Sequence, residues 1–347
     1  IYGLSIAINY LYSYLARVYR KNILFSLSGF INSLSVAVCN LILILRCNMG
    51  LESLYISAIV GALIQCMLIE IWIKPHKFIS INLINKDLIC SMIKFSVPLC
   101  VATVSYWLLS GYTKVIRVNY LGNVENGLYA VTNKFAMFLN MVVSIFQFAW
   151  NEMAYMSNRD NERKKMYAVA IEYIIHFVII SACGLMIVSK LAFPVVIGSE
   201  YQKALIYLPA SIVGVAFNAI AGFLGTIFST EKETKYIFWT TFVAAGVNSI
   251  ISIILTKTFN LQGAIIALAI SFGILCIERI ICISVKLRVI INLKKIWEVG
   301  LVLLTIMVFF LSNNKLVDCI YIVLLIIFEI VYDKKKIIEL ISVVRGR

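Results

Sequence analysis

Three basic residues lie in or beside apolar stretches, where an unpaired charge is costly. Lys114 and Arg117 are three positions apart, which places them on one face of a helix. Lys134 lies eight positions beyond Asn126 and so roughly 12 Å along its own helix. Arg provides a bidentate fork and Lys a point charge, so together they predict a cationic cavity for an anionic headgroup. Alternatively, these long side chains reach out to the polar surface of a membrane.

A carboxylate and an imidazole share a second apolar stretch. Glu172 and His176 are four positions apart and therefore on one helix face, roughly 10 and 16 Å from the end of that helix. Such a pair can relay protons at depth in a membrane, which predicts a site for proton or cation coupling. The alternative is a buried hydrogen-bonded pair with only a packing role.

The sequence contains no recognisable catalytic motif. It has no GxxxxGK[ST] phosphate loop, no HExxH and no GxSxG, so we expect neither an enzyme nor a cofactor. The nine Cys residues form no CxxC pair, which argues against a metal site or a disulfide framework. The net charge of +14 does not indicate a nucleic-acid partner, because basic residues also gather in the loops of membrane proteins.

The composition explains which elements must position these residues. The 347 residues are 62% hydrophobic and only 14% charged, with a mean hydropathy of +0.95. A soluble domain of this size could not hide so much apolar surface. A membrane span needs about 20 apolar residues in a helix. We therefore predict an all-α polytopic membrane protein with about eleven spans, at 1–16, 24–45, 53–73, 95–116, 127–149, 166–191, 203–229, 236–256, 263–285, 296–312 and 316–332.

The charges of the loops predict an orientation. Most of the 31 Lys and Arg residues fall in alternate loops and in the C-terminal tail. By the positive-inside rule these loops and the C-terminus are cytoplasmic. The opposite loops are all short, which disfavours a protein that builds an active site outside the membrane.

One stretch carries a family resemblance. It contains Ser96-Val97-Pro98-Leu99, then Tyr120-Leu121-Gly122, Gly127-Leu128-Tyr129-Ala130 and Ala149-Trp150-Asn151. These motifs and their spacing resemble helices seven and eight of the Wzx-type O-antigen and polysaccharide flippases of the multidrug/oligosaccharidyl-lipid/polysaccharide superfamily. Where that family often has Asp-Arg, this sequence has Thr113-Lys114, so the acidic neighbour is lost. Gly122 and Gly127 bracket a predicted turn between the two helices.

The resemblance implies fourteen helices in two lobes around a central cavity. The chain opens at Ile1 within an apolar run, so we expect about three helices of the N-terminal lobe to precede it. On this interpretation residues 1–87 are the remainder of the N-terminal lobe. Residues 88–294 form a six-helix C-terminal lobe, and 295–347 add two helices and a cytoplasmic tail.

The implied function is to flip an undecaprenyl-pyrophosphate-linked oligosaccharide, an O-antigen or capsule repeat unit, across the bacterial cytoplasmic (inner) membrane. Lys134, Lys114 and Arg117 would bind the substrate, and a cation gradient acting through Glu172 and His176 would drive it. Implied partners are the lipid-linked substrate, membrane lipids, and polysaccharide polymerase and chain-length proteins. The alternatives are a drug/cation antiporter of the same superfamily, or a membrane-embedded polysaccharide polymerase or ligase.

Overall fold

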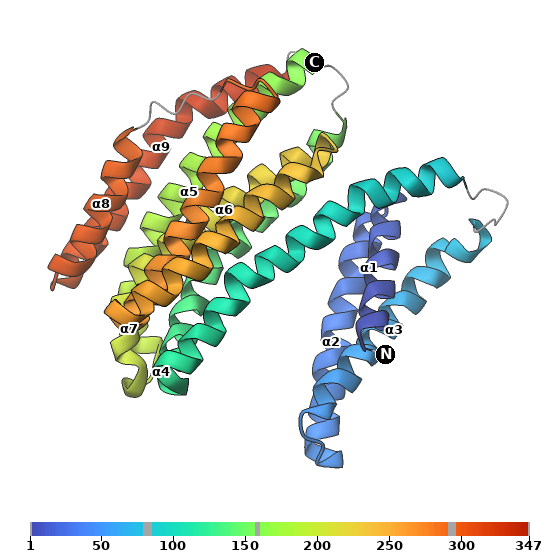
Figure 1. Ribbon diagram of the computed structural model, residues 1–347, viewed down its shortest axis with the longest axis horizontal. Helices are drawn as coiled ribbons and strands as arrows, with labels where there is room; N and C mark the ends of the chain where they lie inside the picture. Colours follow the sequence, from blue (N-terminus) through green and yellow to red (C-terminus); the bar gives the residue numbers. More distant parts are fainter. Residues whose placement is uncertain (1, 79–84, 157–159, 291–295, 346–347) are drawn as a thin grey trace. The chain divides into compact units, whose positions relative to one another are not determined.

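The computed structural model describes residues 2–78, 85–156, 160–290 and 296–345, and all its regular elements there are helices (Figure 1). Six of them are long and apolar enough to cross a membrane. The fold is therefore that of an all-α, multi-pass membrane protein. The elements in chain order are α1 (Tyr2–Val18), α2 (Asn22–Cys47), α3 (Glu52–Ile73), η1 (Pro75–Phe78), α4 (Lys86–Met156), α5 (Asp160–Val196), η3 (Ser199–Tyr207), α6 (Leu208–Thr230), α7 (Thr234–Lys286), α8 (Ile296–Leu311) and α9 (Lys315–Arg345).

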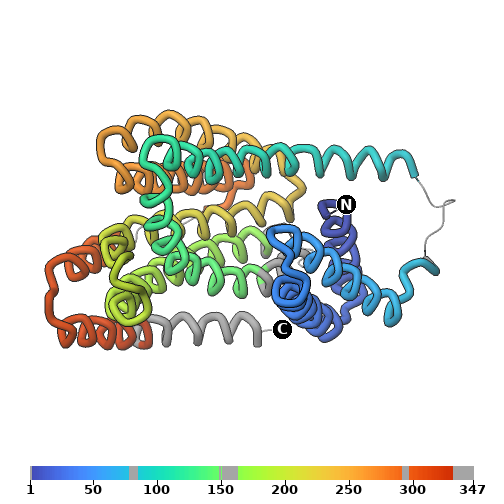
Figure 2. The backbone as a smooth tube through the Cα atoms, turned by 90° about the horizontal axis from the view of Figure 1, so that it is seen from below, coloured from blue at the N-terminus to red at the C-terminus, as the bar shows by residue number. Residues whose placement is uncertain are grey.

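The two longest helices are each broken in two. In α4 the break is at Gly122, with φ 83° and ψ −177°, a conformation essentially restricted to glycine. In α7 it is at Phe259 and Asn260, where Asn260 has φ 51°. Each break lies between two of the predicted spans, and the chain turns back on itself there (Figure 2).

The backbone approaches itself closely at the turn in α7. A Cβ atom added to Gly263 would lie 1.8 Å from the carbonyl oxygen of Leu255, so no other residue fits at this position. Glycine is therefore required where the second half of α7 leaves the turn.

The chain divides into two compact units, Ile1–Ile89 and Cys90–Arg347. In the first unit, α3 packs against α2 and α1. Five of its six buried residues recur every fourth position, and the first three of these are small, so neighbouring helix backbones can approach closely. The series is Ser53, Ser57, Gly61, Gln65 and Ile69. Gln65 donates hydrogen bonds to Ser13 Oγ (3.2 Å) and Ser28 Oγ (3.4 Å), which link α3 to both neighbours.

The second unit is built around α6, which carries no charged residue and packs against α5 and α7. A buried polar network joins α4 to α7. Asn248 Nδ2 donates to Leu109 O and to Thr113 Oγ1, both at 2.7 Å, and Asn248 Oδ1 accepts from two serines. The amide is thus fully satisfied inside an apolar core, as burial requires. Thr113, the residue that departs from the family pattern, has a structural role here.

The second unit also includes the α8–α9 hairpin, residues 296–345. Both of its helices pack against α5, and Figure 1 shows them as the red pair beside that helix. The hairpin closes at Ser312–Asn314, between the end of α8 and the start of α9.

Candidate functional site

Arg117 is buried in the second unit, with 2% of its surface exposed. The break at Gly122 folds the second half of α4 back, so that the Arg117 guanidinium carbon lies 3.6 Å from the centroid of the Tyr129 ring. This is a cation–π contact, which partly compensates the buried charge. Arg117 Nε and Nη1 form no hydrogen bond with any residue that the structure describes. Two buried donors of a cation are therefore available to an anion.

Tyr129 also lines a cleft of about 120 Å³ between both halves of α4, α6 and the second half of α7. Tyr106 donates a hydrogen bond from its hydroxyl to Asn218 Oδ1 (3.2 Å), and its ring lies 6.2 Å from that of Phe272. None of the described lining residues is charged. The polar ones are Tyr106, Ser110, Tyr129, Asn133, Asn140, Ser211 and Asn218.

Hydroxyls and amides both donate and accept hydrogen bonds, and aromatic rings offer flat apolar faces. This combination suits a ligand with many hydroxyl groups and an apolar ring face. The cleft and Arg117 meet at Tyr129, so one side presents neutral polar groups and the other a buried cation.

The two predicted lysines differ from Arg117. Lys114 and Lys134 are both exposed, and neither is among the residues that line the cleft. Lys134 lies beside that face, because Asn133 and Met137 of the same helix line the cleft. Of the three predicted basic residues, only Arg117 is thus buried next to the cleft.

His176 is fully buried in α5, and Glu172, one turn earlier, is half-buried. His176 contacts two carboxylates from the hairpin: Nδ1 lies 3.0 Å from Glu298 Oε1 of α8, and Nε2 lies 3.2 Å from Glu329 Oε2 of α9. The sequence pattern did not predict a site role for either of these two glutamates. Their signal was weak: each is a single acidic residue beside an apolar run, and only the fold brings it to α5.

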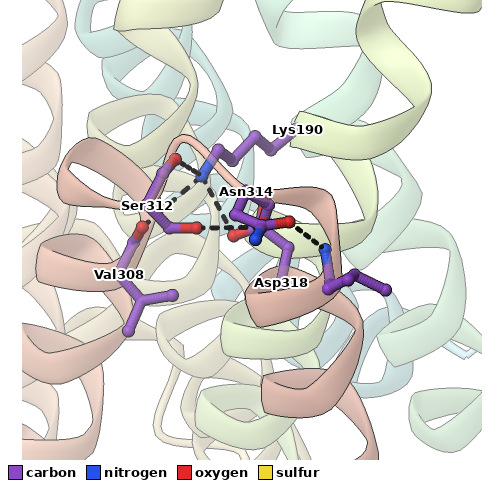
Figure 3. A network of polar contacts seen from close by, with 6 residues as sticks. Lys190, Val308, Ser312, Asn314 and Asp318 are labelled. Carbon is purple, nitrogen blue, oxygen red and sulfur yellow. Dashed lines mark hydrogen bonds and ion pairs between the residues drawn. The ribbon is translucent and has the colours of Figure 1, made fainter.

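A second charged contact joins α5 to the closed end of the hairpin (Figure 3). Lys190 Nζ donates to the carbonyl oxygens of Ser312 (2.7 Å) and Val308 (3.5 Å) and to Asp318 Oδ1 (3.0 Å). The ammonium group thus binds the C-terminal carbonyls of α8, where the helix dipole favours a cation. Asp318 lies in the first turn of α9, where the dipole favours an anion.

Comparison with solved structures shows a shared fold. The chain is similar to a crystal structure of a MATE mutant, with a TM-score of 0.64 and 12% identity over 82% of this chain and 66% of that one. It is also similar to "Lipid II flippase MurJ, inward closed conformation", with a TM-score of 0.53 and 18% identity over 96% of this chain and 73% of that one. The chain thus spans about two thirds to three quarters of these proteins.

No curated protein sequence matches the chain significantly. The family model described as "Polysaccharide biosynthesis protein" matches residues 1–206, which is more than half of the chain. That match includes α1 to α5 and therefore both Arg117 and His176. The chain is accordingly a member of this family of polysaccharide biosynthesis proteins.

Proposed function

We propose that this protein flips an undecaprenyl-pyrophosphate-linked oligosaccharide from the cytoplasmic to the periplasmic leaflet of the bacterial inner membrane. Membership of the polysaccharide biosynthesis family and a fold similar to that of the lipid II flippase MurJ support a flippase. The observation that carries the proposal is Arg117, a buried cation with two donors that bond no described residue, next to a cleft of neutral polar and aromatic groups. The cation would bind the pyrophosphate and the cleft would bind sugar hydroxyls.

The physical reason is the cost of moving a charged and hydroxylated headgroup through lipid. Hydrocarbon solvates neither phosphate nor sugar, so the protein must replace the lost water with its own polar groups. With Arg117 on the pyrophosphate and the cleft on the sugar, Lys134 and Lys114 are further substrate contacts. A cation gradient supplies the driving force, and the C-terminus is cytoplasmic. Polymerase and chain-length proteins would receive the flipped unit.

A drug/cation antiporter is the second candidate, because the MATE mutant shares the fold with a TM-score of 0.64. Such a protein would be expected to present carboxylates to a cationic drug. Among the described residues that line the cleft no carboxylate occurs, and the buried cation Arg117 contacts the lining residue Tyr129. The geometry therefore favours an anionic, hydroxylated substrate.

The test is to delete the gene and follow lipid-linked repeat units in the two leaflets. The proposal expects units to accumulate in the cytoplasmic leaflet, and expects the intact gene to restore export. Units that reach the outer leaflet but stay unpolymerised would instead indicate a polymerase or ligase. Normal export with lost drug resistance would indicate the antiporter.

A further inference from the structure

Two charged contacts hold the α8–α9 hairpin to α5, one near each end of the hairpin. His176 contacts Glu298 and Glu329, and Lys190 contacts Asp318 and the end of α8. His176 and Lys190 are fourteen positions apart on α5, two heptads, and so lie on the same face of that helix. Only the imidazole changes its charge readily near neutral pH.

The geometry around His176 requires a proton beyond those of a neutral ring. A neutral imidazole has one N–H donor and one acceptor nitrogen, but both His176 nitrogens lie within 3.2 Å of a carboxylate oxygen. Two carboxylates can accept from one ring only when both nitrogens carry protons. Without the extra proton, a nitrogen lone pair would face a carboxylate, which is repulsive. Imidazole is a stronger base than a carboxylate, so the ring rather than a glutamate holds this proton.

The two carboxylates that contact His176 differ in exposure. His176 is fully buried, and Trp297 packs in a T-shaped contact against its ring at 5.5 Å between centroids. The Glu298 side chain is 5% exposed, whereas that of Glu329 is 23% exposed. Glu329 is also near the predicted cytoplasmic end of its span, 316–332, so a proton can reach the imidazole from that side.

The structure describes few charged groups around His176. On α5 itself Glu172 lies one turn before it, the basic residues Arg163, Lys164 and Lys165 lie about 17–20 Å away toward the start of the helix, and Lys190 lies about 21 Å away toward its end. The packed helix α6 has no charged residue, and α8 has only Glu298. On α4, the stretch 135–147 that contacts α5 through Phe146 and Tyr173 is also uncharged. On α9, the described side chains contribute Glu329 here, while Lys315 and Asp318 lie at the other end.

We propose that His176, Glu298 and Glu329 form a proton-binding site that clamps the open end of the α8–α9 hairpin to α5. When the proton leaves through Glu329 to water, imidazolium becomes imidazole and one of the two contacts is lost. The contacts of Lys190 persist, so the hairpin loosens at its open end and remains held at its closed end. The docked state binds one more proton than the loosened state, so docking weakens as pH rises.

The role of this site as the coupling site of transport rests on the proposed function. The clamp itself does not, because it needs neither a substrate nor a gradient. The experiment therefore uses the full chain in lipid nanodiscs without substrate. Without substrate, the experiment tests the clamp alone, so its failure is distinguishable from a failure of the proposed transport function.

The first measurement is the ¹⁵N spectrum of labelled histidine. The chain has two histidines, His176 and His76, and His76→Gln leaves only the buried one. We expect both ring nitrogens of His176 to carry protons at pH 7.5. We expect Glu298→Gln combined with Glu329→Gln to convert the ring to the neutral form at that pH. A neutral His176 ring in the His76→Gln protein at pH 7.5 would overturn the proposal.

The second measurement is hydrogen exchange of α8 at pH 6.5 and 8.5, corrected for the intrinsic effect of pH. We expect exchange to rise about tenfold at the higher pH, since a lost charged hydrogen bond changes an opening equilibrium by at least that factor. His176→Gln should remove this dependence, and the matched control His76→Gln should keep it. An equal pH dependence in His176→Gln and the native chain would show that His176 is not the clamp.

Discussion

Arg117 is the proposed contact for the anionic part of the substrate. Its charge is buried, its ring partner Tyr129 is neutral, and two of its donors are unused within the described part of the chain. A charged hydrogen bond contributes about 1.5–3 kcal/mol. We therefore predict that Arg117→Ala lowers the rate of flipping at least tenfold, measured as repeat units exported by cells that express equal amounts of protein.

The control for this prediction is Arg117→Lys. Lysine keeps the charge but not the fork, so it should retain part of the activity. Activity of Arg117→Ala equal to that of the native protein would exclude Arg117 as a substrate contact.

Lys134 is exposed beside the cleft face of α4, and no hydrogen bond or ion pair joins it to another described residue, so it can meet a substrate directly. We expect Lys134→Ala to impair flipping strongly, Lys134→Arg to retain part of it, and Lys114→Ala to have a smaller effect. The same export assay distinguishes the three variants. A normally active Lys134→Ala protein would limit the cationic site to Arg117.

At the level of the elements, the turns inside α4 and α7 decide which residues meet. The turn at Gly122 brings Tyr129 onto Arg117, and the turn at Phe259–Asn260 brings the second half of α7 to the cleft. A substitution that opens either turn should therefore affect both stability and the site.

Gly263→Ala tests the turn in α7. Its Cβ would lie 1.8 Å from the Leu255 carbonyl oxygen, and backbone cannot move aside as a flexible side chain can. We predict a loss of about 1–3 kcal/mol in the free energy of unfolding, measured by denaturation in detergent. Gly246→Ala in the same helix is the matched control, because nothing lies within 4 Å of its added Cβ. Equal stability of the two variants would contradict the close approach at Gly263.

The helices were largely predictable from the sequence, but the contacts between them were not. Long apolar runs fix where helices form, and the turn at Gly122 followed from a glycine between two such runs. The pairing of Glu172 with His176 was predicted from spacing along one helix alone. The observed partners Glu298 and Glu329 are more than 120 positions away from His176, and no periodicity within α5 could reveal them.

The burial of the basic residues also could not be predicted from the local sequence. Lys114, Arg117 and Lys134 all lie in apolar surroundings in the sequence, yet only Arg117 is buried. Three positions separate Lys114 from Arg117, and the folded neighbour Tyr129 decides which of the two faces the core. The local sequence pattern indicates how far along a helix a residue lies. The packing of elements that are distant in sequence determines whether its side chain is exposed.

For the whole molecule, the charge distribution predicts an orientation. The C-terminus and the loop at Lys232 should be cytoplasmic, and Ser199 should face the periplasm. The prediction is tested by placing a single cysteine at Ser199 or at Lys232 in a chain from which the native cysteines have been removed. A thiol reagent that cannot cross the membrane should label Ser199→Cys in intact cells and Lys232→Cys only after lysis. The reverse pattern would show that the molecule is inverted.

We propose above that this chain moves a pyrophosphate-linked saccharide across a bilayer. To test this, the purified chain is reconstituted in liposomes with a short polyprenyl-pyrophosphate oligosaccharide that carries a fluorophore. A quencher added outside the liposomes then reports how fast the fluorescent lipid reaches the outer leaflet. We predict rapid exchange between leaflets with the native chain, and at least tenfold slower exchange with Arg117→Ala. Exchange no faster than in liposomes without protein would contradict the claim.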